Sequence, residues 1–241
     1  MNTIEPMILK ELRDTDYQSL IKFRIRKILI ICSNYDAFIL EEDGQIESQI
    51  YKEYIDLNLS NPPQFVWVQT SAQAREILNT VVGIDMVMCM YNVGDKEIFS
   101  LASELKHDRP NLPFVLLTHF SKEIYRRLSL LDTSAIDYMF SWHGNADLIV
   151  AIIKLFEDLK NADNDILEVG VQAILLVEDS VRYYSTYLPE LYKMIIKQGG
   201  EFLKETINEQ KRKFRKRSRP KILLATNYDD AMAMYAKYKS N

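Results

Sequence analysis

Two adjacent carboxylates at the end of an apolar run are the residues whose types and spacing most directly suggest chemistry. Glu178 and Asp179 follow at once on residues 173–177, AILLV. This pattern is typical of a buried parallel strand that ends at the crevice where open α/β sheets bind ligands. Neighbouring acids repel each other unless a proton or cation relieves them, so Mg²⁺ is the expected counter-charge. The alternative is that both acids merely begin the next helix, where the helix dipole favours them.

A second suggestive segment is the basic run KRKFRKRSRPK at residues 211–221. Such a run can hold the phosphate groups of a nucleotide or of nucleic acid. We prefer the alternatives, a solvated helix end or a partner for acids on a neighbouring domain, because cations are favoured at helix C-termini. The net charge of -4 also argues against general nucleic-acid binding. The candidate residues are Lys211, Arg212, Lys213, Arg215, Lys216, Arg217 and Arg219.

The elements that must position these residues are short apolar strands separated by amphipathic helices. Strands are expected at 28–32, 65–69, 85–90, 113–118 and 135–140, and helices at about 35–58, 72–81, 96–107, 122–131 and 145–160. Parallel neighbouring strands need crossover helices. The alternation therefore predicts a doubly wound α/β domain with a five-stranded parallel sheet over residues 25–160, after a helical lead-in at 1–24.

Composition narrows the class of protein. The 241 residues are 47% hydrophobic and 27% charged, which is typical of a soluble globular protein. We expect a cytoplasmic protein without a membrane partner, because the N-terminus is too charged for a secretory signal and no apolar run is long enough to span a bilayer. Cys32 and Cys89 are expected to be buried thiols.

Residues 25–160 resemble a response-regulator receiver domain, which implies a flavodoxin-like sheet with strand order 2-1-3-4-5. Aligned on that pattern, the acid pair is replaced by Cys32 and Ser33, the phospho-accepting Asp by Met90 and the lysine by Ser141. Only Thr118 matches. A thioether cannot form an acyl phosphate, and a pocket without carboxylates cannot hold Mg²⁺. The resemblance therefore implies a pseudo-receiver with no cofactor.

Residues 161–170 are expected to form a linker, and 171–241 the first half of a second receiver-like module. In it, a strand at 173–177 precedes a long helix from Val181 to about residue 214, a strand at 222–225 and a helix at 229–238. The apolar stripe of the long helix needs a partner, either the first domain or a second copy of the chain. Because further strands are needed to complete the module, we expect the remainder of a longer chain as a partner, and Mg²⁺ in the completed module.

Four segments carry a further resemblance: SNYDAFILEEDG, FSWHGNADLIVAIIKLFED, VGVQAILLVEDSVRYYSTYLPELY and RPKILLATNYDDA. Together they resemble the N-terminal region of bacterial phosphoenolpyruvate synthase-like proteins, in which an ATP-binding region follows tandem receiver-like modules. The resemblance implies ATP-dependent phosphotransfer in the longer protein, with pyruvate as a candidate acceptor. None of those catalytic residues lies in this sequence, so the chain itself is not expected to be an enzyme.

Three hypotheses for function remain open. The preferred one is a non-catalytic regulatory and docking region. Its partner surface would be the face formed by the fourth helix, fifth strand and fifth helix, which includes Phe140, Trp142 and His143. The same face is, besides the long helix, an alternative surface for a homodimer. The others are a phospho-accepting receiver in the completed second module and a sensor of a small molecule or nucleotide in the crevice of the first domain.

Overall fold

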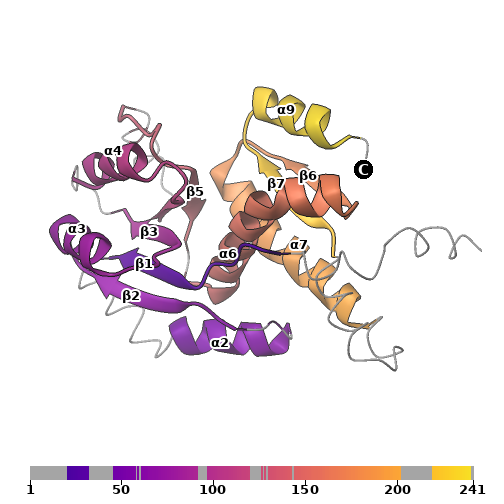
Figure 1. Cartoon of the computed structure of the whole chain (residues 1–241), viewed down its shortest axis with the longest axis horizontal. Coiled ribbons are helices and arrows are strands. Elements are labelled where there is room, and N and C mark those ends of the chain that lie inside the picture. Colours follow the sequence, from indigo (N-terminus) through magenta and orange to yellow (C-terminus); the bar gives the residue numbers. More distant parts are fainter. Residues whose placement is uncertain are drawn as a thin grey trace, which may run out of the picture. The chain divides into compact units, whose positions relative to one another are not determined.

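The computed structural model describes residues 21–32, 46–57, 59, 61–91, 97–119, 126, 128, 130–142, 144–201 and 219–239 (Figure 1). These residues fall into two compact units. The five-stranded unit comprises Ile25–Ile153 and Ser180–Glu190. The two-stranded unit comprises, of the described residues, 21–24, 154–179, 191–201 and 219–239.

The five-stranded unit has the predicted doubly wound α/β fold. All neighbouring strands are parallel, and their order is β2-β1-β3-β4-β5, as in a flavodoxin-like receiver. This confirms the predicted fold class. The strands are β1 (Lys27–Ile31), β2 (Gln64–Val68), β3 (Met86–Met90), β4 (Phe114–Thr118) and β5 (Tyr138–Ser141), and the helices are α2 (Ile46–Asp56), α3 (Ser71–Thr80), α4 (Glu97–Asp108) and the first part of α6 (Ala146–Ala162).

Successive strand residues point to opposite sides of this sheet, and residues on both sides are buried. On one face, Leu29, Val87 and Leu116 pack with apolar side chains of α3 and α4. On the other, Ile28 and Met86 are fully buried. Near-continuous apolar strands are what a sheet covered on both faces requires.

Strand β5 begins three residues later than predicted, at Tyr138 instead of Ala135. Residues 133–136 form a turn in which the Ile136 N–H donates to the Thr133 carbonyl. The Asp137 carboxylate then accepts from the Phe114 N–H at 2.6 Å and from Lys106 Nζ at 2.7 Å. Apolar residues before Asp137 therefore belong to the turn. Of the helix predicted at 122–131, most residues lie outside the described ranges.

The two-stranded unit contains the end of α6, a π-helical turn and a pair of parallel strands. The elements are η2 (Asp163–Glu168), β6 (Ala173–Val177), β7 (Lys221–Ala225) and α9 (Tyr228–Tyr238). Helix α7 spans Val181–Glu201, and its second half, from Leu191, belongs to this unit. Helix α9 starts at the N-cap Asn227, whose side chain accepts from the Asp230 N–H at 2.8 Å. The predicted continuation of α7 beyond Glu201 lies outside the described residues.

Residues 161–170 differ from the expected linker. Helix α6 continues to Ala162 and η2 follows directly. Asp165 is fully buried and forms an ion pair with Lys221 Nζ at 2.9 Å, and Asn161 accepts from the Phe23 N–H at 2.9 Å. The polar composition of this segment reflects buried polar pairing, which hydropathy alone does not distinguish from exposure.

Among the described helices, none is long and apolar enough to cross a membrane.

Candidate functional site

The carboxyl edge of the five-stranded sheet brings together four of the five residues predicted for a degenerate receiver pocket. The register aligns Ile31 with Cys89, Met90 with Leu117, and Thr118 with Ser141. Cys32, Thr118 and Ser141 are buried, and Met90 is half-buried. The fifth predicted residue, Ser33, lies outside the described residues.

These positions supply a thiol, a thioether and two hydroxyls. None of the four side chains is a carboxylate, so they offer neither the anionic oxygens that Mg²⁺ prefers nor a nucleophile that forms an acyl phosphate. Cys32 and Cys89 are both buried, and neither forms a disulfide. Within the described part of the chain, no group of three or more His, Cys, Asp and Glu side chains is placed to hold a metal ion.

The outer edge of β5 is covered by the first half of α7. The Ser141 N–H donates to Ser185 Oγ at 2.9 Å, and Ser185 Oγ donates to the Val181 carbonyl at 2.5 Å. The Tyr184 hydroxyl donates to the Met139 carbonyl. Both backbone groups point away from β4, because alternate residues of a strand bond to opposite neighbours. Two helix side chains therefore satisfy the backbone groups of an edge strand.

Burial of Tyr184 makes this cover tight. Its ring meets Phe140 edge to face, with ring centroids 5.4 Å apart. Burial also raises the pKa of the Tyr184 phenol, and nearby Tyr138 adds to the shift. The neutral hydroxyl is the donor that the Met139 carbonyl needs.

The predicted partner surface on the fifth strand needs correction. Phe140 is fully buried and Trp142 is 3% exposed, so neither side chain is available to another protein in this structure. The physical reason is that Tyr184 of α7 packs against Phe140. His143, the third residue predicted for this surface, lies outside the described residues.

A pocket of about 170 Å³ lies beside Ser141, between the start of α6 and the start of α7. Its charged lining residues are Asp147, Arg182 and Glu190, and the remaining ones are Asn145, Ser185, Thr186 and Pro189. Ligand pockets for drug-sized molecules measure about 300–1,000 Å³. The pocket is therefore smaller than the usual range for such ligands.

The acid pair lies in the two-stranded unit, in the connection between β6 and α7. Glu178 is half-buried and Asp179 is exposed. The Glu178 N–H donates to the Ala225 carbonyl at 3.0 Å, which extends the pairing of β6 with β7 by one residue. Both carboxylates therefore stand at the carboxyl end of β6, as the sequence predicts, and just before the first turn of α7.

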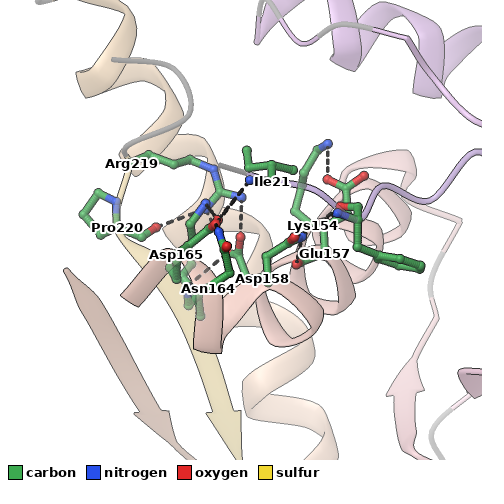
Figure 2. Close-up of polar contacts among 12 residues, drawn as sticks. Ile21, Lys154, Glu157, Asp158, Asn164, Asp165, Arg219 and Pro220 are labelled. Atoms are coloured by element: carbon green, nitrogen blue, oxygen red, sulfur yellow. Dashed lines mark hydrogen bonds and ion pairs between the residues drawn. The ribbon is translucent and has the colours of Figure 1, made fainter. Parts of the chain in front are cut away.

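The only described member of the predicted basic residues, Arg219, serves a different purpose (Figure 2). Its Nη1 and Nη2 atoms donate to the two Asp158 carboxylate oxygens, each at 2.8 Å, and the two side chains are 7% and 2% exposed. Asp158 Oδ2 also accepts from the Tyr192 hydroxyl at 2.9 Å and from the Ile222 N–H at 3.0 Å. Arg219 is thus a buried structural ion pair, while residues 211–217 of the basic run lie outside the described residues.

Ionisation in this cluster is shifted by burial. Burial raises the pKa of Tyr192 well above its ordinary value, and the Asp158 charge adds to the shift. Burial lowers the pKa of Lys221, although the charges of Asp158 and Asp165 partly oppose the shift. Sequence reasoning missed both aspartates. The available signal for Asp158 was an acid within the largely apolar helix segment LIVAIIKLFEDLKNA, where an unpaired charge would be costly.

Among known proteins, this chain is similar only to solved structures, and only in fold. No protein-family model and no curated protein matches the chain. Solved structures similar to it include the signal receiver domain of an HD domain-containing protein from Pseudomonas fluorescens Pf-5, with 16% identity, a TM-score of 0.42 and coverage of 59% of this chain and 94% of that one. Another is an adenylate cyclase from Rhodopirellula baltica, with 11% identity, a TM-score of 0.41 and coverage of 61% and 98%. The receiver-like fold therefore rests on the strand order and register of this chain.

Proposed function

We propose that the five-stranded unit is a non-catalytic, receiver-like regulatory module that works by docking and not by accepting a phosphoryl group. The observation that carries the proposal is the carboxyl edge of its sheet, where Cys32, Met90, Thr118 and Ser141 stand at the strand ends. A thioether at the acceptor position has no oxygen to attack a phosphoryl donor.

The docking half of the proposal rests on α7. Tyr184 and Ser185 bond to the two outward backbone groups of β5, and Tyr184 packs on Phe140. The edge of β5 is therefore a binding surface that already holds a segment of its own chain. We propose that this internal occupant is the regulated element of the module.

Acyl-phosphate labelling tests the first half of the proposal. The full chain is incubated with Mg²⁺ and acetyl phosphate, and hydroxylamine-sensitive phosphate is located by mass spectrometry. We expect no label in residues 25–153, while a working receiver domain treated in parallel is labelled. A hydroxylamine-sensitive label in this range, retained in Met90→Leu, would contradict the proposal.

A second candidate function is a metal-dependent receiver built on the two-stranded unit. It is favoured by the position of Glu178 and Asp179 at the carboxyl end of β6. We propose Mg²⁺ as the ion, since paired carboxylates are hard oxygen ligands. Calorimetric titration with Mg²⁺ should give a heat of binding that Asp179→Asn abolishes and that the exposed control Asp229→Asn leaves unchanged; equal heats in all three proteins would exclude the site.

A further proposal concerns a longer protein that would contain this chain. We propose that the chain belongs to a phosphoenolpyruvate synthase-like protein, on the four resembling segments alone, and that the remainder of that protein is a partner of these units. The native polypeptide, isolated from its source and analysed by mass spectrometry, should then extend through an ATP-binding region. A native mass equal to that of these 241 residues would contradict this part only.

A further inference from the structure

The pocket beside Ser141 has no role in the function proposed above. All its lining residues belong to the five-stranded unit: Ser141 ends β5, Asp147 lies in the first turn of α6, and most of the others lie on α7. Its volume of about 170 Å³ equals that of about six water molecules, at about 30 Å³ each in the liquid. The pocket therefore has room for one small molecule.

Helix α7 turns one face to this pocket. The residues of that face are Arg182, Ser185, Thr186, Pro189 and Glu190. Their spacing of three or four residues places them on one side of the helix. A cation thus stands near the start of α7, and a carboxylate stands about 12 Å further along the helix axis, at 1.5 Å per residue. The pocket has charges of opposite sign along its length.

Both of these charged side chains are open to a ligand. Arg182 and Glu190 are exposed, and among the described residues neither side chain has an ion-pair or hydrogen-bond partner. A guanidinium holds a carboxylate through two parallel N–H···O bonds, and a carboxylate accepts hydrogen bonds from an ammonium group. The face therefore offers a site for an anionic group and, apart from it, a site for a cationic group.

The floor of the pocket adds a further acceptor. Pro189 lies inside α7 and has no N–H, so the Ser185 carbonyl does not receive the helix hydrogen bond that another residue at position 189 would donate. Ser185 and Pro189 are buried and line the pocket beside Glu190. The Glu190 end of the pocket is thus rich in acceptors, as an amine requires.

We propose that this pocket binds a small linear molecule with a carboxylate at one end and a primary amine at the other, as in an ω-amino acid. Arg182 holds the carboxylate, and Glu190 and the Ser185 carbonyl accept from the ammonium group. A linear molecule suits the site better than glycine, whose charged groups are attached to one carbon atom, because Arg182 and Glu190 arise about 12 Å apart along the helix axis.

Binding has a consequence for the cover of β5, and this part rests on the proposed docking function. The same turns of α7 carry Tyr184 and Ser185, which bond to the backbone of β5. The pocket is complete only while these turns lie beside Ser141 and the start of α6. A ligand that prefers the complete pocket therefore shifts the population toward the covered edge, by its difference in affinity for the two states.

Calorimetric titration of the full chain with ε-aminocaproate tests the site. We expect saturable binding of one molecule per chain. Caproate lacks the amine and hexylamine lacks the carboxylate, so each should bind about tenfold more weakly or worse, because each loses one charge-assisted pair. Equal affinities for the three compounds, or no saturable binding of ε-aminocaproate, would overturn the inference.

Substitutions assign the two ends of the ligand. Arg182→Gln should weaken ε-aminocaproate binding about tenfold or more and leave the weak binding of hexylamine unchanged, whereas Glu190→Gln should weaken it as much and leave that of caproate unchanged. Lys197→Gln is the matched control, because it removes a positive charge from an exposed residue of α7 outside the pocket. Equal losses in Arg182→Gln and Lys197→Gln would refute the site, since they would show a general effect of charge.

Hydrogen exchange at the Ser141 amide, measured by NMR, separates this inference from the docking function. At a ligand concentration of ten times Kd, ε-aminocaproate should slow this exchange about tenfold in the unsubstituted chain, and much less in Arg182→Gln at the same concentration. Saturable binding without slower exchange would overturn the consequence for β5. Exchange at Ser141 as fast as in an unfolded peptide, with and without the ligand, would contradict the docking function itself.

Discussion

The outer edges of β5 and β6 present the same backbone N–H and C=O groups, but they differ in what lies beside those groups. At β5, Ser185 and Tyr184 bond to the Ser141 N–H and the Met139 carbonyl. At β6, the outward groups of Ala173, Leu175 and Val177 have no strand beside them within the described residues. The outward backbone groups of an edge strand can thus be bonded by helix side chains in place of another strand. This requires a hydroxyl donor and a hydroxyl acceptor at adjacent positions of the helix.

Coverage also explains which residues are buried. All five residues of β7 are buried, although it has one strand neighbour, because the Asp158 cluster lies against its outer edge. Strand β6 has the same number of strand neighbours and is only half-buried. The difference teaches that the position of a strand in a sheet does not alone determine its exposure.

The largest expected effect comes from breaking the cover of β7. Asp158→Ala leaves Arg219 buried without its carboxylate and removes the acceptor of the Ile222 N–H. Removing one partner of a buried ion pair costs about 3–5 kcal/mol of unfolding free energy. Urea unfolding of the full chain measures it. Asp163→Asn is the control: its ion pair with Lys237 is exposed, and such pairs contribute about 0–1 kcal/mol. Equal losses in the two variants would show that the buried pair does not hold this edge.

A smaller effect is expected from opening the cover of β5. Tyr184→Phe removes the donor to the Met139 carbonyl and leaves a buried acceptor unpaired, which costs about 1–3 kcal/mol. Ser185→Ala should in addition speed hydrogen exchange at the Ser141 amide, measured by NMR. Tyr183→Phe is the control, because that side chain is 51% exposed. Unchanged exchange at Ser141 in Ser185→Ala would mean that α7 does not protect the edge.

The smallest effect is alkaline destabilisation of both covers. The pKa values of Tyr184 and Tyr192 are raised in the folded protein above the ordinary value of 10.0, chiefly by burial. Their stabilisation is therefore complete below that value and is lost progressively as pH rises from it towards the raised pKa of the folded protein, since the unfolded chain then releases protons that the folded chain retains. At about pH 10.5 the loss is below about 1 kcal/mol for each tyrosine.

Lys221 acts in the opposite sense up to its ordinary pKa of 10.5, because its pKa is lowered by burial. The net loss should therefore become plain only above about pH 10.5. Thermal unfolding followed between about pH 9 and pH 11.5 checks this, with Tyr184→Phe expected to flatten the decline. A decline of the same slope in Tyr184→Phe would contradict the assignment to Tyr184.

Sequence reasoning predicted the residues at the candidate pocket because strand ends are local features. The positions of Cys32, Met90, Thr118 and Ser141 follow from apolar runs and the crossovers between them, and the register places them at one edge. The acid pair was likewise located by the run before it. Burial of Phe140 and the role of Arg219 were not predicted, since neither depends on neighbours in the sequence.

The sequence alone determined the order of strands and helices, because the alternation of apolar and polar residues is read over a few residues at a time. Only the tertiary structure decided which polar residues are structural. Ser141 meets Ser185 across 44 positions of sequence, and Arg219 meets Asp158 across 61. A charge or hydroxyl is stable in the interior only beside its partner, and no local pattern states which distant segment will bring that partner.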